Sequence, residues 1–195
     1  MEEERNEKEL AEARRKVCEV FDALGIPYKV FMHAPIFSAA ERVEKQVEVD
    51  GLICKNLFLR NKEKSRYYLY TLPIDKRADL AALQKALGES RLSFGDAEAL
   101  WEMLHITPGT VSLLNIIGAR TDISSDLSGS LLDKSPDNIG CSQERPFKYL
   151  VDAEVLEVPG IGLHPNDNAA TIVFPPDRLP DILDRYGADF EFISL

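Results

Sequence analysis

Apolar positions at helical and strand spacing outline the first quarter of the chain. Apolar residues from Leu10 to Phe21 recur at the spacing of helical turns and a glycine follows them, which predicts a helix over residues 3–24. The sequence IPYKVF, residues 26–31, is typical of a short strand. Residues 38–47 begin with Ser-Ala-Ala-Glu, a capping-box pattern that predicts a short helix.

The middle of the chain carries two neighbouring strand patterns. Leu57, Phe58 and Leu59 are consecutive apolar residues within LICKNLFLR, residues 52–60, so a strand there must be buried on both faces. The sequence RYYLYTLP, residues 66–73, is rich in aromatic residues that favour strands. A short polar segment separates the two patterns, and together they predict an antiparallel hairpin.

Further helix and strand patterns follow toward the C-terminal end. Residues 121–145 are polar and rich in Ser, Asp, Gly and Pro, and we interpret them as an insertion. Before this insertion, the patterns predict a helix that Asp79 caps and Gly88 ends, a second helix with Ala97, Leu100, Trp101 and Leu104 on one face, and a turn into a strand over 106–117. After it, they predict a strand over 147–158 and another that ends at Phe174. A helix that Asp177 caps, with Leu179, Ile182, Leu183 and Tyr186 inward, and a closing strand over 189–195 complete the chain.

The order of these elements indicates the fold class. Strands and helices are mixed without a strict βαβ rhythm, which favours a mixed sheet over a doubly wound one. We expect a single α/β domain over residues 1–195, with a mixed, curved or partly barrel-like sheet and surrounding helices. Neither a GxGxxG motif nor a P-loop occurs in the sequence.

The composition favours one hydrophobic core in a reducing compartment. The chain has 195 residues, 45% of them hydrophobic, which is enough for a core without cross-links. Its three cysteines lie far apart and show no zinc-site spacing, so we expect no metal and a cytoplasmic location. The charged N-terminus has no apolar core of a secretory signal, and no apolar run approaches the roughly 20 residues that span a bilayer.

Charge is distributed unevenly along the chain. The net charge is −10, which argues against a nucleic-acid partner. Residues 55–91, however, hold nine basic and four acidic residues, so this segment carries a charge of +5. Such a basic face can hold a few phosphates, whereas the alternative is a solvated charged hairpin. DNA binding is the weaker hypothesis, since no helix-turn-helix pattern occurs.

Polar residues stand at the ends of three apolar strand patterns. Lys55 and Asn56 precede one apolar strand triplet; Lys55 either carries its charge to solvent along a buried stem or directs it at a ligand oxygen. Gly109 lies in a turn, and its backbone either only connects two elements or approaches a ligand closely. His164 begins the sequence HPNDN, where it is a general base, a hydrogen-bond donor or a histidine at a strand end. No GxSxG motif occurs, so water is the expected nucleophile of any hydrolysis.

These stretches together resemble a known family. HAPIFS at residues 33–38, the long stretch with KNLFL, RLSF and TPGTVS at 54–112, and LHPNDNAATIVF at 163–174 are similar to the YbaK and prolyl-tRNA-synthetase-associated editing-domain family. The resemblance is strongest to its free-standing alanyl-tRNA(Pro) deacylases of the PrdX/ProX type. Two features depart from the family pattern: Leu113 stands where the glycine loop commonly has proline, and the 121–145 insertion is long.

The resemblance implies a trans-editing deacylase without metal or organic cofactor. The expected reaction is hydrolysis of mischarged tRNA(Pro), most plainly Ala-tRNA(Pro), with the tRNA(Pro) acceptor end as partner and prolyl-tRNA synthetase or elongation factor as further partners. The alternative is a non-catalytic module that binds aminoacyl-tRNA or an amino acid. The implied catalytic residues are Lys55, Gly109 and His164; the implied substrate-binding residues are His33, Asn56, Ser112, Asn168 and Thr171; the expected tRNA-binding residues are Arg60, Lys76, Arg77 and Arg91.

Overall fold

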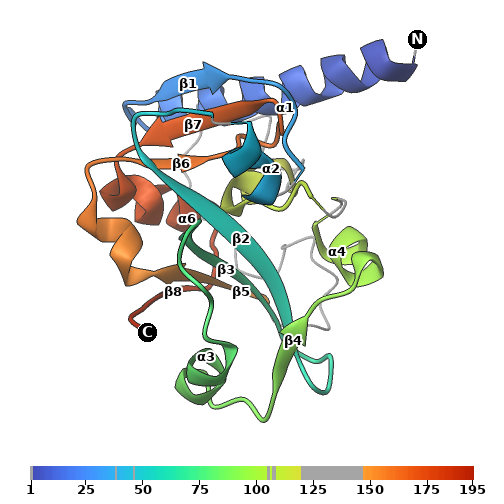
Figure 1. Ribbon diagram of the computed structural model, residues 1–195, viewed down its shortest axis with the longest axis vertical. Helices are drawn as coiled ribbons and strands as arrows, with labels where there is room; N and C mark the ends of the chain where they lie inside the picture. Colours follow the sequence, from blue (N-terminus) through green and yellow to red (C-terminus); the bar gives the residue numbers. More distant parts are fainter. Residues whose placement is uncertain (1, 38, 46, 105, 107–108, 120–146) are drawn as a thin grey trace, which may run out of the picture.

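A mixed sheet of eight strands forms the centre of the computed structural model (Figure 1). The structure describes residues 2–37, 39–45, 47–104, 106, 109–119 and 147–195. The strand order is β1-β7-β6-β2-β3-β5-β8, with β4 pairing with β2, so the described sheet is open at β1 and β8. The predicted mixed α/β class is confirmed. The strands are β1 Lys29–Met32, β2 Leu52–Asn61, β3 Tyr67–Pro73, β4 Leu92–Phe94, β5 Phe147–Asp152, β6 Ile161–Leu163, β7 Ala170–Phe174 and β8 Phe190–Ile193.

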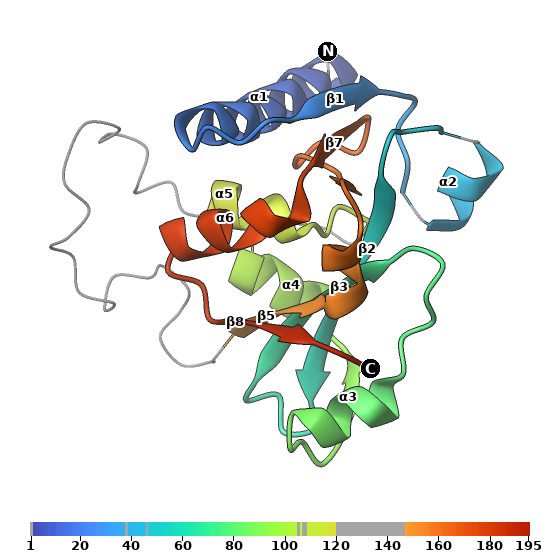
Figure 2. The same ribbon diagram turned by 90° about the vertical axis from the view of Figure 1, so that its left-hand side faces the viewer.

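Helices cover both faces of this sheet. Figure 2 shows α4, α5 and α6 on one side and α2 and α3 on the other, with α1 lying along β1 and β7. Short 3-10 turns connect several of these elements. The helices are α1 Glu2–Ala23, α2 Ala39–Glu44, α3 Leu80–Ala86, α4 Ala97–Leu104, α5 Ile116–Ala119 and α6 Leu179–Arg185, and the 3-10 turns are η1 Leu113–Asn115, η4 Ala153–Glu157 and η5 Pro176–Arg178.

The apolar triplet of β2 divides the core between the two faces. Phe58 is 6% exposed and stacks on Tyr67, with ring centroids 5.5 Å apart. Leu59 is fully buried on the other face, in a cluster with Tyr68 and with Leu83 of α3. Burial of each such side chain contributes about 1.5–3 kcal/mol. The prediction that this strand is buried on both faces is confirmed.

One edge of β2 is shared by two short strands. The parallel strand β6 pairs with Leu52 and Ile53, and β4 pairs with Leu59–Asn61, while β3 pairs along the other edge. Between these two pairings, no described strand continues the ladder. Gly95 donates to the Phe58 oxygen on this edge and Ile74 donates to the Ile53 oxygen on the opposite edge. Because backbone hydrogen bonds alternate along a strand, the Cys54 carbonyl and the backbone groups of Asn56 face the gap, whereas the Cys54 N–H still belongs to the ladder with β6.

Several predicted elements are confirmed with small changes in their limits. The N-terminal helix spans Glu2–Ala23, and β2 and β3 form the expected antiparallel hairpin. Asp79 caps α3, since its side chain accepts hydrogen bonds from the backbone nitrogens of Ala81 and Ala82 at 3.0 and 2.9 Å.

Two strand predictions were wrong in part. The apolar run after residue 112 forms η1 and α5 rather than a strand, because Ser112 and Asn115 cap each other's backbone groups in a capping box. The predicted strand over 147–158 stops at Asp152, whose side chain accepts a hydrogen bond from Glu154 N and begins η4. In both places a local side-chain bond to the backbone competes successfully with strand formation.

Two side-chain predictions on the helices were also wrong. Of the predicted face, Ala97 is exposed and Trp101 is 57% exposed, because the buried face of α4 is instead formed by Ala99, Leu100, Met103 and Leu104. Asp177 lies inside η5 and does not cap α6, whose first residue follows Arg178 without a side-chain cap. The insertion at 121–145 lies outside the described residues.

The two aspartates provide a stability test of helix capping. We expect Asp79→Ala to lower the free energy of unfolding by about 1 kcal/mol, because two backbone N–H groups lose their acceptor. Asp177→Ala, the matched control, should change it by less than about 0.5 kcal/mol. Urea denaturation measures both values, and equal losses would contradict the assignment of the cap.

Candidate functional site

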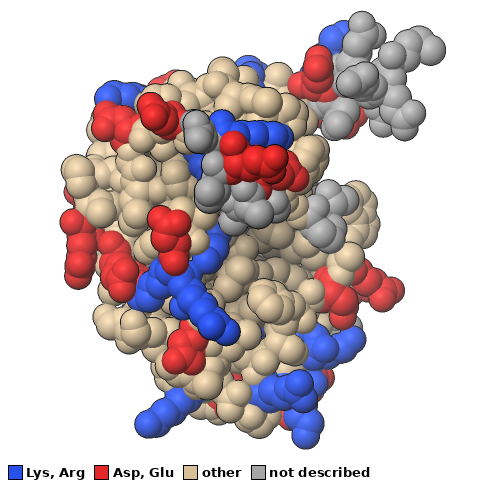
Figure 3. Space-filling view, in the orientation of Figure 1, with Lys and Arg blue, Asp and Glu red and all other residues tan. Residues whose placement is uncertain are grey.

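A cavity of about 290 Å³ lies at the open edge of β2. Figure 3 shows a recessed, largely uncharged area below α2, with Lys and Arg side chains along its border. The size is that of a small ligand site, at the lower end of the common range. Seven of the eight residues predicted to act on substrate contribute to its walls, namely His33, Lys55, Asn56, Gly109, His164, Asn168 and Thr171.

Lys55 reaches the cavity from β2 without a carboxylate partner. Its Nζ donates to the Ile74 backbone oxygen at 2.7 Å, which fixes the side chain against the end of β3. An ammonium has three N–H donors, so two remain for a ligand. Within the described part of the chain, no ion pair involves Lys55. The geometry therefore favours the ligand-directed interpretation over a charge that only reaches solvent.

Asn56 connects β2 to the loop that closes the cavity. Its Oδ1 accepts hydrogen bonds from Thr71 Oγ1 at 2.8 Å and from the backbone nitrogen of Leu113 at 3.2 Å. These two bonds orient the amide, and its Nδ2 donors have no partner among the described residues. The side chain therefore holds the loop and still offers donors to the cavity.

Ser112 lies behind the cavity wall rather than in it. The residue is fully buried, and its Oγ donates to the His164 backbone oxygen at 2.8 Å. The same Oγ accepts a bond from Leu114 N at 3.2 Å as part of the cap of η1. This position supports the wall, and it differs from the substrate contact that the sequence analysis expects.

Gly109 is required by both its conformation and its surroundings. Its φ of +91° lies in the region that side-chain-bearing residues rarely adopt. A Cβ atom here would also stand 3.3 Å from the Phe37 backbone oxygen. The absence of a Cβ atom at Gly109 therefore lets its backbone lie close to Phe37, in the segment before α2, and approach a ligand in the cavity.

His164 presents a lone pair on a neutral ring. Its Nε2 lies 2.9 Å from the Val111 backbone oxygen, which only accepts, so Nε2 carries the proton. Burial lowers the pKa of His164 below 6.5, and the nearby Arg42 charge acts in the same direction. Nδ1 is then an acceptor, and it is buried without a partner among the described residues.

A chain of hydrogen bonds joins His33, Thr171 and Arg42 in the cavity wall. Arg42 Nη1 donates to Thr171 Oγ1 at 3.0 Å. His33 Nδ1 donates to the Ala34 backbone oxygen at 2.9 Å, so its Nε2 can accept from Thr171 Oγ1 at 2.9 Å. Arg42 is not among the residues predicted from the sequence, because a basic residue on a short helix gives no functional signal of its own.

The HPNDN loop, residues 164–168, is held in place by contacts with η1 and with α1. Asn166 adopts a φ of +59° and bonds through its amide to Leu114 O and to Asn115 Nδ2, which ties the loop to η1. Asp167 is 2% exposed and pairs with Arg14 of α1. This packing places Asn168 in the cavity wall, with its Oδ1 buried and unpartnered among the described residues.

The described cavity wall is cationic although the whole chain is acidic. Arg42 and Lys55 carry permanent charges, and no Asp or Glu occurs among the described residues that line it. Cys54 also lines the cavity, but burial and the Asp152 charge raise the pKa of its thiol to about 12. This thiol stays protonated at neutral pH and is a poor nucleophile.

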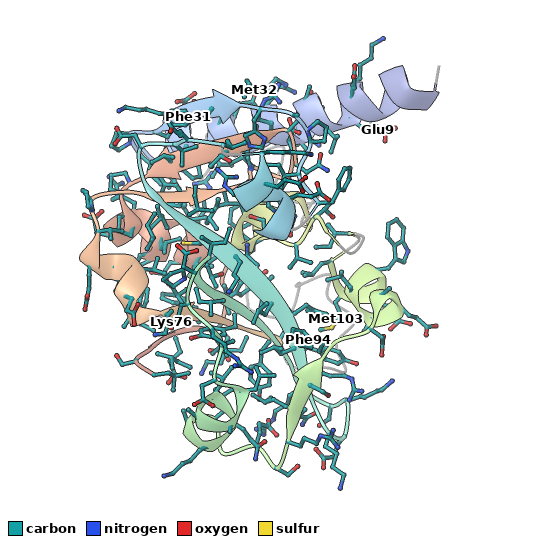
Figure 4. The ribbon with its side chains drawn as sticks, in the orientation of Figure 1. Glu9, Phe31, Met32, Lys76, Phe94 and Met103 are labelled. Atoms are coloured by element: carbon teal, nitrogen blue, oxygen red, sulfur yellow. The ribbon has the colours of Figure 1, made fainter. Side chains whose placement is uncertain are left out.

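The residues expected to bind tRNA have different surroundings. Lys76 Nζ forms ion pairs with Asp152 and Glu154, so its positive charge is neutralised within the protein. Figure 4 shows Lys76 on the side of β2 opposite to Phe94 and Met103. Arg60 is partly buried and donates to the Asn61 backbone oxygen, while Arg77 and Arg91 are exposed.

Comparison with known proteins assigns the chain to a family. Residues 33–182 match the family of the aminoacyl-tRNA editing domain. The chain is 27% identical over 184 residues to the prolyl-tRNA editing protein ProX of Acetoanaerobium sticklandii, covering 94% of this chain and 98% of that protein. It is 26% identical to prolyl-tRNA synthetase associated domain-containing protein 1 of Mus musculus, covering 92% and 94%. The protein belongs to the aminoacyl-tRNA editing domain family.

A solved structure supports the same fold. The crystal structure of hypothetical protein APE2540 superposes with a TM-score of 0.58, covering 91% of this chain and 97% of that one at 16% sequence identity.

None of the helices that the structure describes has the length and hydrophobicity needed to span a bilayer.

Arg14 and its neighbour test how the HPNDN loop is held. Arg14→Met leaves the buried Asp167 carboxylate without its cation, and we expect a loss of about 3 kcal/mol in the free energy of unfolding. Hydrogen exchange at the Ala169 amide, which donates to Asp167 Oδ1 at 2.9 Å, should become faster. Urea denaturation and hydrogen exchange measure the two effects.

The matched control is Arg15→Met. Arg15 pairs with Glu12 and Glu19 on the exposed face of the same helix. Because exposed ion pairs contribute little to stability, the control should leave both the free energy of unfolding and the exchange of the Ala169 amide nearly unchanged. Equal effects of the two substitutions would show that the pair with Asp167 does not support the loop.

Proposed function

We propose that the protein hydrolyses the ester bond of mischarged tRNA(Pro), with Ala-tRNA(Pro) as its main substrate. The observation that carries the proposal is the cavity at the open edge of β2, where Lys55, Gly109 and His164 meet without a carboxylate among the described lining residues. The names of the two relatives, which refer to prolyl-tRNA editing and to prolyl-tRNA synthetase, support it. We place the reaction in the cytoplasm.

Each cavity residue contacts a different part of the substrate in this proposal. Lys55 contacts the terminal phosphate or the ester carbonyl with its remaining N–H donors. Backbone donors at Gly109 hold the carbonyl oxygen as it becomes negative. His164 Nδ1 and Asn168 Oδ1, both acceptors, orient the attacking water or the α-ammonium group.

Water is the nucleophile in this mechanism. Its oxygen attacks the ester carbon, the bond to the ribose oxygen breaks, and a proton from the water passes to the ribose oxygen, which yields the free amino acid and a ribose hydroxyl. The neighbouring ribose hydroxyl of the tRNA assists this proton transfer. Because an aminoacyl ester is intrinsically reactive, positioning supplies most of the required help.

Amino-acid selection is steric in this proposal. Gly162 lies at the cavity floor, and a Cβ atom there would meet Ile53 Cδ1 at 2.6 Å and Thr171 Cγ2 at 3.1 Å, so the floor is tightly packed. A small alanyl group fits such a site, whereas a larger prolyl group is excluded by contact. Rejection of a larger group by overlap is easier than rejection of a smaller one by affinity.

The acceptor end of tRNA(Pro) is the proposed macromolecular partner. Arg60, Arg77 and Arg91 remain the candidates for backbone contacts, whereas Lys76 is engaged in ion pairs. Prolyl-tRNA synthetase or elongation factor would deliver or receive the tRNA.

A deacylation assay on two charged tRNAs tests the proposal. We expect the wild type to hydrolyse Ala-tRNA(Pro) and to spare Pro-tRNA(Pro). Lys55→Ala should lower kcat/KM for Ala-tRNA(Pro) by about 10²–10³, the usual effect of removing a donor to the developing charge. The matched control is Lys62→Ala, which removes an exposed lysine in the β2–β3 turn. It should change kcat/KM for Ala-tRNA(Pro) by less than about threefold, the size of effect expected from losing about one contact to a tRNA phosphate.

The outcomes separate the competing functions. If neither ester is hydrolysed by the wild type, the enzyme hypothesis fails, and tight binding of charged tRNA without turnover would favour a regulatory module. If both esters are hydrolysed equally, the proposed editing specificity fails.

The pH dependence of deacylation tests His164. Because the pKa of His164 lies below 6.5, the ring is neutral at pH 7 and Nδ1 accepts; acid protonates Nδ1 and removes the acceptor. After subtraction of the uncatalysed rate, we expect kcat/KM to stay level from pH 7.5 to about 6.5 and to fall below it. His164→Gln keeps a donor for Val111 O but has no acceptor at the Nδ1 position, so it should be at least about 100-fold slower. A wild-type decline centred above pH 6.5 would contradict the neutral ring.

A further inference from the structure

Arg42 is a cation in the cavity wall that the mechanism above does not use. It belongs to α2, and its Nη1 donates to Thr171 Oγ1 at 3.0 Å. Its Nη2 is buried and has no hydrogen-bond partner among the described residues. One half of the guanidinium is therefore anchored while the other half has an unused donor.

The nearby carboxylates are bound elsewhere. Glu41, its neighbour in sequence, accepts from Phe37 N at 3.2 Å and from Lys45 Nζ at 3.3 Å. Asp167 accepts from Ala169 N and pairs with Arg14. No ion pair of the described chain includes Arg42, so its charge is not balanced within this part of the protein.

Burial makes this unbalanced charge unfavourable. Removing a guanidinium from water without a partner costs free energy, and burial accordingly lowers the pKa of Arg42. A negatively charged oxygen within hydrogen-bond distance of Nη2 would offset that cost. The planar guanidinium suits such oxygens better than an ammonium does, because its donors lie in a fixed fork.

We propose that Arg42 is a substrate-binding residue whose Nη2 donates to a negatively charged oxygen of the bound aminoacyl-nucleotide. The oxygen belongs either to the phosphate of the terminal nucleotide or to the ester carbonyl as it becomes negative. Arg42 then acts from α2 while Lys55 acts from β2, so cations from two different elements of the cavity wall contact the substrate. The identity of the ligand rests on the proposed function.

Binding of nucleotides tests the phosphate source without any hydrolysis. Adenosine 5′-monophosphate and adenosine are titrated into the full-length protein by calorimetry or NMR. If Arg42 holds the phosphate, the wild type binds the monophosphate at least tenfold more tightly than adenosine. Arg42→Met should abolish this preference, and Arg42→Lys should retain part of it.

Kinetics on two esters test the carbonyl source. The substrates are Ala-tRNA(Pro) and 3′-O-alanyl-adenosine, which has no phosphate. If Arg42 stabilises the carbonyl oxygen, Arg42→Met lowers kcat at least tenfold on both esters and leaves the nucleotide preference unchanged. If it holds the phosphate, the loss appears in KM for Ala-tRNA(Pro) and is absent for 3′-O-alanyl-adenosine.

Controls separate binding from folding and from the proposed function. Arg66→Met removes an exposed arginine that pairs with Glu89 and should alter neither measurement. Thermal unfolding of Arg42→Met should occur at no lower temperature than that of the wild type, because relief of the unbalanced buried charge offsets loss of the hydrogen bond to Thr171.

Failure of the proposal differs from failure of the proposed function. The role of Arg42 is overturned if Arg42→Met matches the wild type in nucleotide preference and in the kinetics of both esters. It is also overturned if the wild type shows neither a nucleotide preference nor hydrolysis. If the wild type hydrolyses no ester but prefers the monophosphate through Arg42, the proposed deacylase function fails and the anion site stands.

Discussion

The gap in the pairing along one edge of β2 is the constraint on which the site depends. β6 pairs with the beginning of this strand and β4 with its end, so the Cys54 carbonyl and the backbone groups of Asn56 are left facing a space between them. Buried backbone groups need partners, and a loop, a ligand or water must supply them. The loop before η1 and the HPNDN loop close around this space and leave the cavity between them. A continuous ladder along this edge would remove the cavity.

The walls are held by side chains that bond to backbone across long sequence distances. Asn56 accepts a hydrogen bond from the backbone N–H of Leu113, and the proline expected at this position from the family resemblance would be unable to donate it because proline has no N–H. Ser112 and Asn166 then join η1 to the HPNDN loop, and Arg14 holds that loop from α1. The departure at Leu113 therefore has a structural counterpart in the orientation of the Asn56 amide.

Electrostatics distinguish the cavity from the rest of the molecule. An acidic chain with a net charge of −10 places two permanent cations in a wall where the described lining residues include no carboxylate. His164 is kept neutral by burial, so that it accepts hydrogen bonds where its charged form would only donate. Such an arrangement suits a ligand with a negative oxygen at one point and hydrogen-bond donors at another. An aminoacyl ester of a nucleotide has both.

The sequence by itself determined the elements whose causes are local. The apolar triplet of β2 required a strand buried on both faces, the polar turn after it produced the hairpin with β3, and Asp79 began α3 through its own backbone contacts. The resemblance to family motifs then selected Lys55, Gly109 and His164, which do lie in one cavity wall.

Tertiary structure decided everything that depends on partners distant in the sequence. The capping box of Ser112 with Asn115 that selects η1 is itself local, and the fold adds only the burial of both side chains. From the sequence, Lys76 was expected to bind tRNA, whereas Arg42 gave no functional signal. The fold places Lys76 against the carboxylates of Asp152 and Glu154, whereas it leaves Arg42 Nη2 buried and unpartnered among the described residues. The role of a charge is set by its desolvation and by its neighbours, and both arise only when distant segments pack together.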